Sequence, residues 1–556
     1  MLTELVPSQP FLEGATNTFW ETIVRSRIIS TVSTVTDRYS RAAALDVFDA
    51  DEIAMHRALR VLRAARNAVL PSHRLPPELL SHIFSLCAVD ADAWWDMSPP
   101  RLGWVIVAHV CRHWRAVALE CSGLWADNVT FTRGEQWFHE ILRRANGLPL
   151  CIDTSYIKFD TEAVLALVVA NLASTRELRI GDDIMMALID SDLPPSSRLL
   201  SEENTAPLLD TLVIYDNDED YEAPSLSQLG SCAPNLRQVY VTSSYVELPW
   251  TSSLLKNLTV LNVKRSCPPS DQTDKMDDVF SALQRMPLLE SLRIIDFLPV
   301  AGAAKPGDTI TLLHLTEFEL GGSTRPSMTL LRAVVAPNCT VARISLFCDV
   351  ADDVLATHSE VLAWLKKHWR VSPRALGMSA PFLRQWMFSE RAVTMDAWAY
   401  PPALMHCGTL AATANATLRI AWETDDPELP KQLTLAFWRV LHTAALEQLA
   451  TELDCWDLQM WRDVVGGHAG LKRVAAAEMA GNALLEALSA DTQRIFLPSL
   501  STVDLLDTLF FKVGTTDPRY PGLPELLAAR VEAGCSAMTV TFGDARVRLD
   551  GAVELA

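Results

Sequence analysis

Apolar residues in the second part of the chain recur in a short motif, L-x-x-L-x-L, with apolar and polar positions alternating. Clear copies are LDTLVI (209–214), LRQVYV (236–241), LTVLNV (258–263), LESLRI (289–294) and LTEFEL (315–320). Looser copies are TRELRI (175–180), VARISL (341–346), LKRVAA (471–476), LSTVDL (500–505) and CSAMTV (535–540). The stretch 348–426 has no clean copy, and TLRIAWE (417–423) is its best candidate strand. A period of two predicts that each copy forms a short β-strand with one buried face.

The spacing of these copies predicts a repeated architecture. Between residues 178 and 344 their middle positions are 22 to 34 residues apart. A period near this length with this motif is typical of leucine-rich repeats, in which each repeat supplies one strand and a helical or irregular return. One repeat cannot bury its own apolar face, so the repeats must stack. We therefore predict an irregular α/β leucine-rich-repeat solenoid over residues 128–556, with repeat boundaries left open after residue 350.

Residues that alternate with the buried positions are predicted to line the concave face of this solenoid. Strand by strand they are Thr211, Val213, Tyr215, Gln238, Tyr240, Thr242, Val260, Asn262, Lys264, Ser291, Arg293, Ile295, Glu317, Glu319, Arg343, Ser345 and Phe347. Their mixed chemistry suits a protein or peptide target, although a merely solvated face is the alternative. Candidate target-binding residues are Tyr215, Tyr240, Asn262 and Arg293.

Residues before position 128 carry helical rather than strand patterns. Residues 1–40 show no strong period and are predicted to be an irregular segment. Residues 41–70 are predicted to be a helix with a weak heptad pattern, in which Phe48, Met55, Leu62 and Val69 fall seven apart. This pattern fits packing on a neighbouring helix better than a coiled-coil dimer, although both remain open.

A second helical unit is predicted over residues 71–127. Pro76 and Pro77 suit the start of a helix, because its first turn needs no backbone donor. An apolar stripe follows at Leu79, Leu80, Ile83, Phe84 and Cys87. After a polar loop at 90–101, a second helix is predicted from about Leu102 to Cys121.

That second helix contains a possible zinc cluster, made of His109, Cys111, His113 and Cys121. On one continuous helix the two histidines share a face, whereas Cys111 lies about 200° away from them. The cysteines then belong to the apolar face, so no zinc site is expected.

The two segments LPPELLSHIF (75–84) and VAHVCRHWRAVALECSGLW (107–125) together resemble an F-box. In that family the first segment reads L-P-x-E-[LI]-[LI]-x-x-[IL]-[FL], and the second reads [VLI]-C-[RK]-x-W-[RK] before a Leu-Trp pair. The intervening loop is longer than usual in the family. This length, the upstream helix and the phrase ILRRANGLPLCID (141–153) are similar to the expanded F-box families of mushroom-forming fungi.

The resemblance implies a non-catalytic substrate-receptor subunit of an SCF-type ubiquitin ligase. Such a subunit would bind a Skp-type adaptor and, through the adaptor, a cullin, while its repeats hold an unknown protein target. The implied adaptor-binding residues are Leu75, Pro76, Leu79, Leu80, Ile83, Phe84, Val110, Cys111, Trp114, Leu124 and Trp125. For each, packing inside the F-box is the alternative, particularly for Leu80, Phe84 and Trp125. An interaction scaffold acting outside ubiquitin ligation is the alternative function.

Composition and charge indicate which partners and which cell compartment the chain suits. The chain has 68 acidic and 48 basic residues, a net charge of -20, which disfavours a nucleic-acid partner. We recognise no signal peptide, and the apolar runs are too short for a membrane span. The 11 cysteines, none spaced C-x-x-C, favour reduced thiols in the cytoplasm or nucleus.

The sequence matches none of the common motifs for enzymatic chemistry. The segment HEILR (139–143) places Arg143 where a zinc protease has its second histidine. We find no phosphate-binding loop, dinucleotide-binding motif or nucleophile elbow. We therefore expect no catalytic residue, metal or cofactor.

Overall fold

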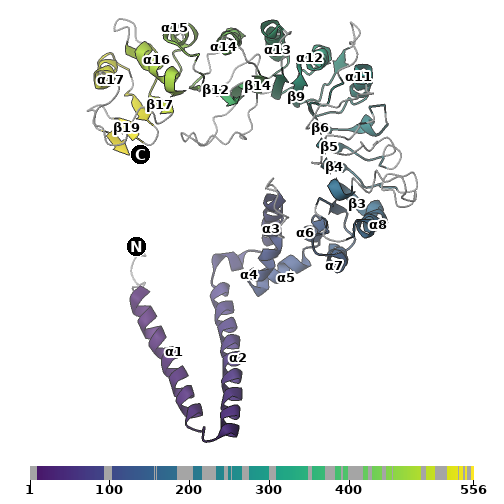
Figure 1. Cartoon of the computed structure of the whole chain (residues 1–556), viewed down its shortest axis with the longest axis vertical. Helices are drawn as coiled ribbons and strands as arrows, with labels where there is room; N and C mark the ends of the chain where they lie inside the picture. Colours follow the sequence, from purple (N-terminus) through teal and green to yellow (C-terminus); the bar gives the residue numbers. More distant parts are fainter. Residues whose placement is uncertain are drawn as a thin grey trace. The chain divides into compact units, whose positions relative to one another are not determined.

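The computed structural model describes residues 9–92, 103–155, 157, 160–184, 205–215, 233–242, 248, 250–251, 253–265, 275–299, 309–347, 353–369, 382–389, 392–398, 418–423, 429–440, 446–451, 453, 455–466, 468–489, 496–506, 523–535, 537–542, 545–547 and 553–555. The chain divides into two compact units, Met1–Trp125 and Ala126–Ala556. The first is helical and the second mixes helices with a sheet (Figure 1). Among the described helices, none is long and apolar enough to cross a membrane.

The first unit begins with two long helices, α1 (Gln9–Val32) and α2 (Arg38–Ala68). Helix α2 starts at a capping box, because the Asp37 carboxylate accepts from the backbone N–H of Ser40 and the Ser40 hydroxyl accepts from the backbone N–H of Asp37. The bounds predicted for this helix, 41–70, are within three residues of those of α2. The prediction of an irregular segment at 1–40 was wrong, because most of it is helical. The missed signal is the recurrence of apolar pairs at 19–20, 23–24 and 28–29, about one turn apart.

The rest of the first unit is built from shorter helices. They are the 3-10 turn η1 (Pro71–Arg74), α3 (Pro77–Asp92), η2 (Gly103–Ile106), α4 (Val107–Val110), α5 (Arg112–Glu120) and α6 (Ser122–Ala126). The predicted single helix over 102–121 was wrong. Cys111 is extended, with φ -158° and ψ 169°, and separates α4 from α5. Most of the predicted loop at 90–101 lies outside the described residues.

The second unit contains a sheet whose first strands pair in parallel and in chain order. They are β1 (Val129–Thr130), β2 (Leu150–Asp153), β3 (Thr175–Ile180), β4 (Thr211–Tyr215), β5 (Gln238–Thr242), β6 (Val260–Lys264), β7 (Ser291–Ile295), β9 (Glu317–Ser323), β11 (Val341–Phe347) and β14 (Leu418–Glu423). Strands β8 (Ile310–Thr311) and β10 (Val334–Val335) form a separate parallel pair.

The sheet continues through an antiparallel hairpin of β12 (Phe382–Ser389) and β13 (Ala392–Trp398), which lies between β14 and β15. Parallel pairing then resumes through β15 (Gln448–Thr451), β16 (Arg473–Ala477), β17 (Thr502–Leu506) and β18 (Thr539–Phe542). Antiparallel β19 (Ala545–Val547) and β20 (Val553–Leu555) follow.

Helices connect the strands and lie along one side of the strand layer (Figure 1). They are α7 (Glu135–Ala145), α8 (Thr161–Asn171), α11 (Met276–Gln284), α12 (Thr324–Ala333), α13 (Val354–His368), α14 (Leu429–Val440), α15 (Leu458–Met460), α16 (Glu478–Ser489) and α17 (Leu523–Glu532). Shorter turns are η3 (Leu172–Ser174), η6 (Ser253–Asn257) and the π-helical η8 (Trp461–Val465).

A hydrogen-bond pattern recurs at the start of the strands. The carbonyl of the residue before a strand accepts two backbone N–H groups from the following strand region, as Asp210 accepts from Arg237 and Gln238. The carbonyls of Arg237 and Glu290 do the same. Each motif thus repeats the geometry of the preceding one, which fixes the strands in register.

The motif leucines form the core between strands and helices. Leu212, Val239, Leu261 and Leu292 are buried and occupy matched positions on β4 to β7. Every one of the predicted motif copies contains part of a strand. This confirms a region rich in helices and strands with a parallel sheet. The β12–β13 hairpin was not predicted.

Candidate functional site

The first part of the candidate site is the start of helix α3. Leu75 is extended, and the Pro76 carbonyl accepts from the backbone N–H groups of Leu79 and Leu80 at 3.1 Å each. Pro77 is the first helical residue, where its missing N–H costs nothing. Glu78 places a negative charge at the positive end of the helix dipole. The two prolines thus fix where α3 starts and which residues each face carries.

Helix α3 has two distinct apolar faces. Leu80 and Phe84 are both 0% exposed, and Ala88 continues the same buried row at a spacing of four. Leu79 is 52% exposed and Ile83 37%. The one-residue offset turns the two rows by about 100° around the helix. One row therefore builds the core, and the other presents leucine and isoleucine to the surface.

The core beneath α3 is aromatic. Phe84 packs on Trp114, with ring centroids 5.3 Å apart, and Trp104 packs edge-on against Trp125 at 4.9 Å. The Trp125 indole N–H donates to the carbonyl of Ala118 at 2.8 Å, so this polar group is satisfied inside the core. These contacts join α3, η2, α5 and α6 and hold the exposed row of α3 in place.

Cys111 is the N-cap of helix α5. Its sulfur accepts a hydrogen bond from the backbone N–H of Trp114 at 3.4 Å. The argument from a continuous helix face was therefore wrong in its geometry, since Cys111 is not helical. Among the described residues, no group of three or more histidine, cysteine or acidic side chains is placed to hold a metal ion.

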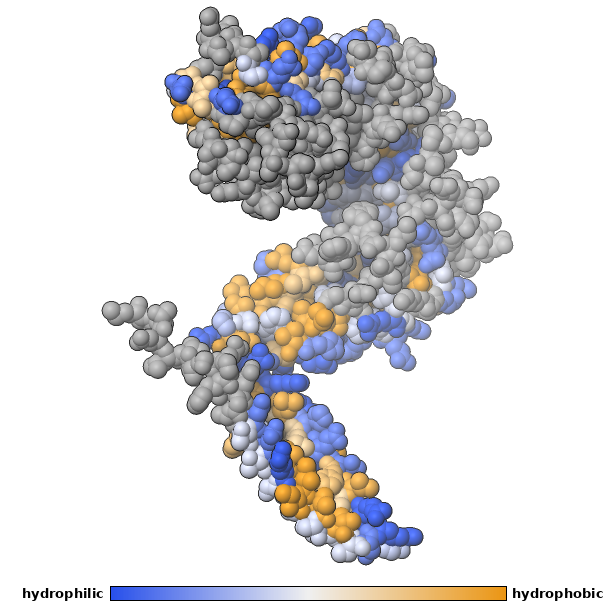
Figure 2. All heavy atoms as spheres, turned by 60° about the vertical axis from the view of Figure 1, so that its left-hand side comes forward, coloured by the Kyte–Doolittle hydropathy of each residue, from blue (hydrophilic) through white to orange (hydrophobic). Residues whose placement is uncertain are grey.

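Exposed apolar side chains gather on the surface of this unit (Figure 2). Leu86 continues the row of Leu79 and Ile83 on α3, and Ile106 and Val110 are exposed on η2 and α4. Soluble proteins seldom expose several large apolar residues together unless the surface binds a partner. The geometry therefore supports a docking surface for an apolar partner.

The predicted adaptor-binding residues separate into two sets. Leu75, Pro76, Leu79, Ile83, Val110, Cys111 and Trp114 are exposed or half-buried. Leu80, Phe84, Leu124 and Trp125 are buried in the core, which does not fit direct contact with a partner. The sequence-based prediction did not include Leu86 and Ile106, which are also exposed apolar residues of this unit. The spacing of 79, 83 and 86 could have identified Leu86.

Two histidines connect η1 to α5. The rings of His73 and His113 are 4.7 Å apart in an edge-on arrangement. His113 is thus a half-buried residue that packs against η1.

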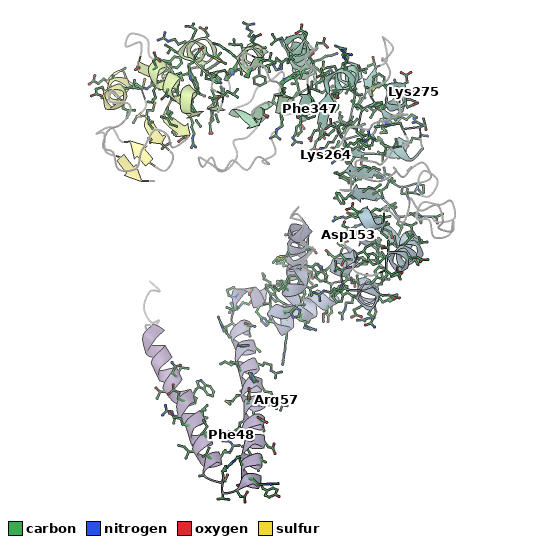
Figure 3. All side chains as sticks on the ribbon, in the orientation of Figure 1. Phe48, Arg57, Asp153, Lys264, Lys275 and Phe347 are labelled. Carbon is green, nitrogen blue, oxygen red and sulfur yellow. The ribbon has the colours of Figure 1, made fainter. Side chains whose placement is uncertain are left out.

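The second part of the candidate site is the sheet face opposite the helices. Figure 3 shows Asp153, Lys264 and Phe347 on this side of the strand layer. Tyr240, Asn262 and Arg293 are in register on β5, β6 and β7, so they form one row across strands that are spaced about 4.8 Å apart. Tyr215 lies two residues further along β4, in register with Thr242.

The four candidate target-binding residues are all half-buried. Burial raises the pKa of the Tyr215 and Tyr240 phenols, so both stay neutral at physiological pH. One residue predicted for this face, Val213, is instead buried. It lies in register between the longer side chains of Arg179 and Tyr240.

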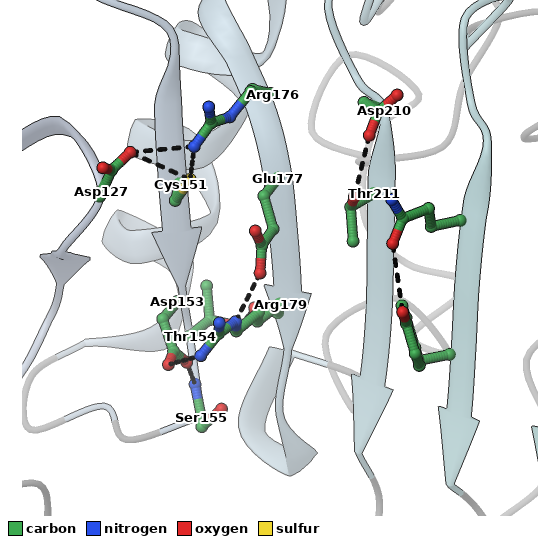
Figure 4. A network of polar contacts seen from close by, with 12 residues as sticks. Asp127, Cys151, Asp153, Thr154, Ser155, Arg176, Glu177, Arg179, Asp210 and Thr211 are labelled. Atoms are coloured by element: carbon green, nitrogen blue, oxygen red, sulfur yellow. Dashed lines mark hydrogen bonds and ion pairs between the residues drawn. The ribbon is translucent and has the colours of Figure 1, made fainter. Parts of the chain in front are cut away.

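Charges on this face are paired, both between strands and within β3. Arg293 on β7 and Arg343 on β11 both approach Glu319 on β9, at 3.3 and 3.5 Å. At the start of the sheet, the Arg179 guanidinium lies 2.8 Å from Glu177 and 3.8 Å from Asp153 (Figure 4). These pairs restrict the side chains that a target would meet.

A cysteine lies beside this network. The Arg176 guanidinium donates to the Cys151 sulfur at 3.1 Å and to Asp127 at 2.9 Å (Figure 4). Burial nevertheless raises the pKa of the Cys151 thiol to about 11. The thiol stays protonated at neutral pH, so this cluster packs β2 against β3 and does not supply a nucleophile.

Comparison with known proteins assigns the helical part of this site to a family. Residues 72–129 match the model of the F-box-like family. No curated protein matches the chain. The matched residues contain α3, α4, α5 and α6, which build both the core and the exposed apolar row. The chain therefore contains an F-box-like domain, a type of domain that binds Skp-type adaptors and belongs to non-catalytic subunits.

Proposed function

We propose that this chain is the substrate receptor of an SCF-type ubiquitin ligase. The observation that carries the proposal is the F-box-like match at 72–129, combined with the exposed apolar row on α3. The domain would bind a Skp-type adaptor and, through it, a cullin. The sheet face would bind a protein target. We also propose the cytoplasm or the nucleus as its place of action, as the cysteine pattern indicates.

The adaptor contact would be made by the accessible residues alone. Leu75, Pro76, Leu79, Ile83 and Val110 offer apolar area that a partner can remove from water. Burying such side chains at the centre of an interface is the main source of affinity between proteins.

Target binding would use the row of residues on the parallel sheet. We infer that strands β3 to β11 belong to an irregular leucine-rich-repeat solenoid, supported by the motif, the spacing and the pairing in chain order. Tyr240 and Arg293 belong to the types enriched where proteins bind one another. Holding a target near activated ubiquitin raises the effective concentration of both, so no residue of this chain need act on the reacting bond.

The adaptor contact is tested by two double variants of the full chain, Leu79→Lys/Ile83→Lys and Leu75→Ala/Pro76→Ala. Charge on the exposed row should lower adaptor recovery in a pull-down by at least about tenfold, because a buried lysine at an apolar interface is costly. The alanine variant should also lose the adaptor. Both should keep the far-ultraviolet circular dichroism of the wild type.

A matched control is Leu313→Lys, at an exposed leucine of the second unit. It should bind the adaptor as the wild type does. Undiminished adaptor recovery by both double variants would contradict the proposal. Recovery of adaptor without cullin, in cells where other F-box proteins recover cullin, would favour the scaffold instead.

A further inference from the structure

Two clusters of charged side chains lie at separate places on the sheet face of the second unit. In the first, the Arg179 guanidinium lies 2.8 Å from Glu177 and 3.8 Å from Asp153 (Figure 4). Asp153 ends β2, and the other two residues belong to β3. We call these three residues the acidic triad, because two carboxylates meet one guanidinium and leave one negative charge in excess.

The second cluster has the reverse composition. The Glu319 carboxylate on β9 lies 3.3 Å from Arg293 on β7 and 3.5 Å from Arg343 on β11, with one arginine at each of its oxygens. These three residues form the basic triad, which has one positive charge in excess. The side chains of both triads are between 22% and 39% exposed, so water screens their charges only in part.

The row of residues between the triads carries no charge. Val213, Tyr240 and Asn262 form this row, in register between an arginine of each triad. Strands β4 and β5 contain no charged residue, and β6 contains one, Lys264, at its end. The face thus has an acidic part, an uncharged middle with a tyrosine, and a basic part.

Other charges on these strands do not cancel this polarity. Of the charged residues on β4 to β11, only Lys264 and Glu317 lie outside the triads, and their charges are opposite. On β3, the remaining charged residue is Arg176, which is paired with Asp127 at 2.9 Å. One negative charge in excess on β2 and β3, and one positive charge in excess from β6 to β11, therefore remain.

The distance between the triads indicates the length of a ligand that meets both. Arg179 on β3 and Glu319 on β9 are five strand spacings apart, about 24 Å along the sheet. An extended chain spans this distance with about seven residues. A short extended segment is therefore enough to reach both triads.

We propose that the sheet face binds an extended target segment that carries a basic and an acidic side chain about seven residues apart. The basic side chain would approach Asp153 and Glu177, and the acidic side chain would accept hydrogen bonds from Arg293 and Arg343. Uncharged residues would lie on the row between the triads. This rests on the proposed function, in which the face holds a protein target, and it adds the charge pattern of that target.

Repulsion at the wrong triad would exclude other segments. A segment with two basic side chains would place one of them beside the two arginines of the basic triad. A segment with two acidic side chains would place one beside the carboxylates of the acidic triad. Like charges brought together across an interface lower affinity, so the spacing and the signs of the charges are both recognised.

Binding of labelled peptides to the purified full chain tests the charge pattern. The first peptide has capped ends and carries Lys and Glu about seven residues apart, among uncharged residues. Matched peptides carry Lys at both positions, Glu at both positions, or Lys and Glu only about three residues apart. At low salt, fluorescence anisotropy should show at least about threefold tighter binding of the first peptide than of each other one, because only the first satisfies both triads.

One substitution in each triad tests where the charges bind. Glu177→Lys gives the acidic triad the composition of the basic one, so this variant should prefer the peptide with two Glu. Arg343→Glu does the reverse, and this variant should prefer the peptide with two Lys. The double variant Glu177→Lys/Arg343→Glu should again prefer the first peptide. Lys275→Glu, at an exposed residue before α11, is the control and should keep the wild-type order.

Two outcomes would overturn the proposal. In one, the wild-type chain binds none of the peptides at about 1 mM or binds them all equally. In the other, Glu177→Lys and Arg343→Glu keep the wild-type order, although circular dichroism shows both variants folded. Adaptor recovery in a pull-down is a separate readout, because the triads belong to the second unit. A chain that recovers the adaptor but shows no peptide preference would refute the charge pattern and leave the adaptor contact standing.

Discussion

At the scale of single residues, the second unit contains a histidine that folding removes from water. His358 on α13 is buried, its Nε2 lies 3.2 Å from the carbonyl oxygen of Leu433, and its ring packs edge-on against Trp422. Burial lowers the pKa of His358 to about 4, because the imidazolium would lose its hydration. The imidazole is therefore neutral in the folded protein near neutral pH.

Stability should fall when the pH drops from 6.5 toward 4. In this range the unfolded chain binds a proton at His358 and the folded chain does not, so protonation favours unfolding. The stabilisation that comes from keeping His358 neutral is fully present above pH 6.5. About 3 kcal/mol of it is lost by pH 4. Urea unfolding of the wild type and of His358→Gln, at pH 7 and pH 4.5, measures the difference.

The Gln variant keeps a donor for the Leu433 carbonyl and should lose less stability between the two pH values. His139→Gln is the control, because the His139 side chain is exposed. An equal loss in the wild type and in His358→Gln would contradict this assignment.

Leu79 and Leu80 on α3 show which features of single residues could be predicted from the sequence and which could not. A single apolar stripe included Leu79 and Leu80 together, although the structure separates them onto two faces. The separation depends on which side α5 covers, and this follows from tertiary packing rather than from local spacing. Cys111 was also out of reach, because a thiol that caps a helix is not a common start signal.

At the scale of elements, strands β16 to β18 share a buried carboxylate. Asp504 on β17 accepts a hydrogen bond from the Arg473 guanidinium of β16 at 2.6 Å and another from the Thr541 hydroxyl of β18. The Asp504 side chain is almost completely buried. One residue therefore ties three neighbouring strands together by charge as well as by backbone hydrogen bonds.

The variant Asp504→Asn should destabilise the second unit by about 1–3 kcal/mol, because it weakens two hydrogen bonds to a buried carboxylate and removes the counter-charge of the half-buried Arg473. An exposed ion pair between two helices, Arg332 with Glu360, provides the comparison. Removing it with Arg332→Gln should cost less than about 1 kcal/mol. Chemical denaturation measures both. Equal costs for the two variants would show that burial of Asp504 adds nothing.

Strands carrying the leucine motif were predictable because alternation reports a half-buried strand directly. The β12–β13 hairpin was not, since its strands lack the motif and their pairing joins residues distant in sequence to β14 and β15. The pattern thus predicted the repeated elements and missed the insertion between them.

At the scale of the whole molecule, the chain divides into the units Met1–Trp125 and Ala126–Ala556. Each unit has its own buried core, aromatic in the first and built on the motif leucines in the second. Units with separate cores can lose structure separately.

The variant Phe84→Ala should therefore destabilise the first unit by about 3–5 kcal/mol, through the cavity it leaves, and spare the second. Hydrogen exchange followed by mass spectrometry should show faster exchange in α3 and α5 and unchanged exchange in β4 to β7. Faster exchange in both units would contradict separate cores.

The burial of Phe84 has a further consequence for how binding is measured. The exposed row of α3 exists only in molecules whose core is folded, so apparent affinity equals intrinsic affinity multiplied by the folded fraction. A core substitution would weaken binding without removing any contact, and excess adaptor would pull the equilibrium back toward the folded form. A surface substitution at Leu79 leaves the folded fraction unchanged and lowers the affinity of every molecule. Titration to saturation at several temperatures would distinguish the core substitution from the surface substitution. Under conditions where every molecule is folded, the core variant should bind with the wild-type affinity, whereas the Leu79 variant should still bind weakly.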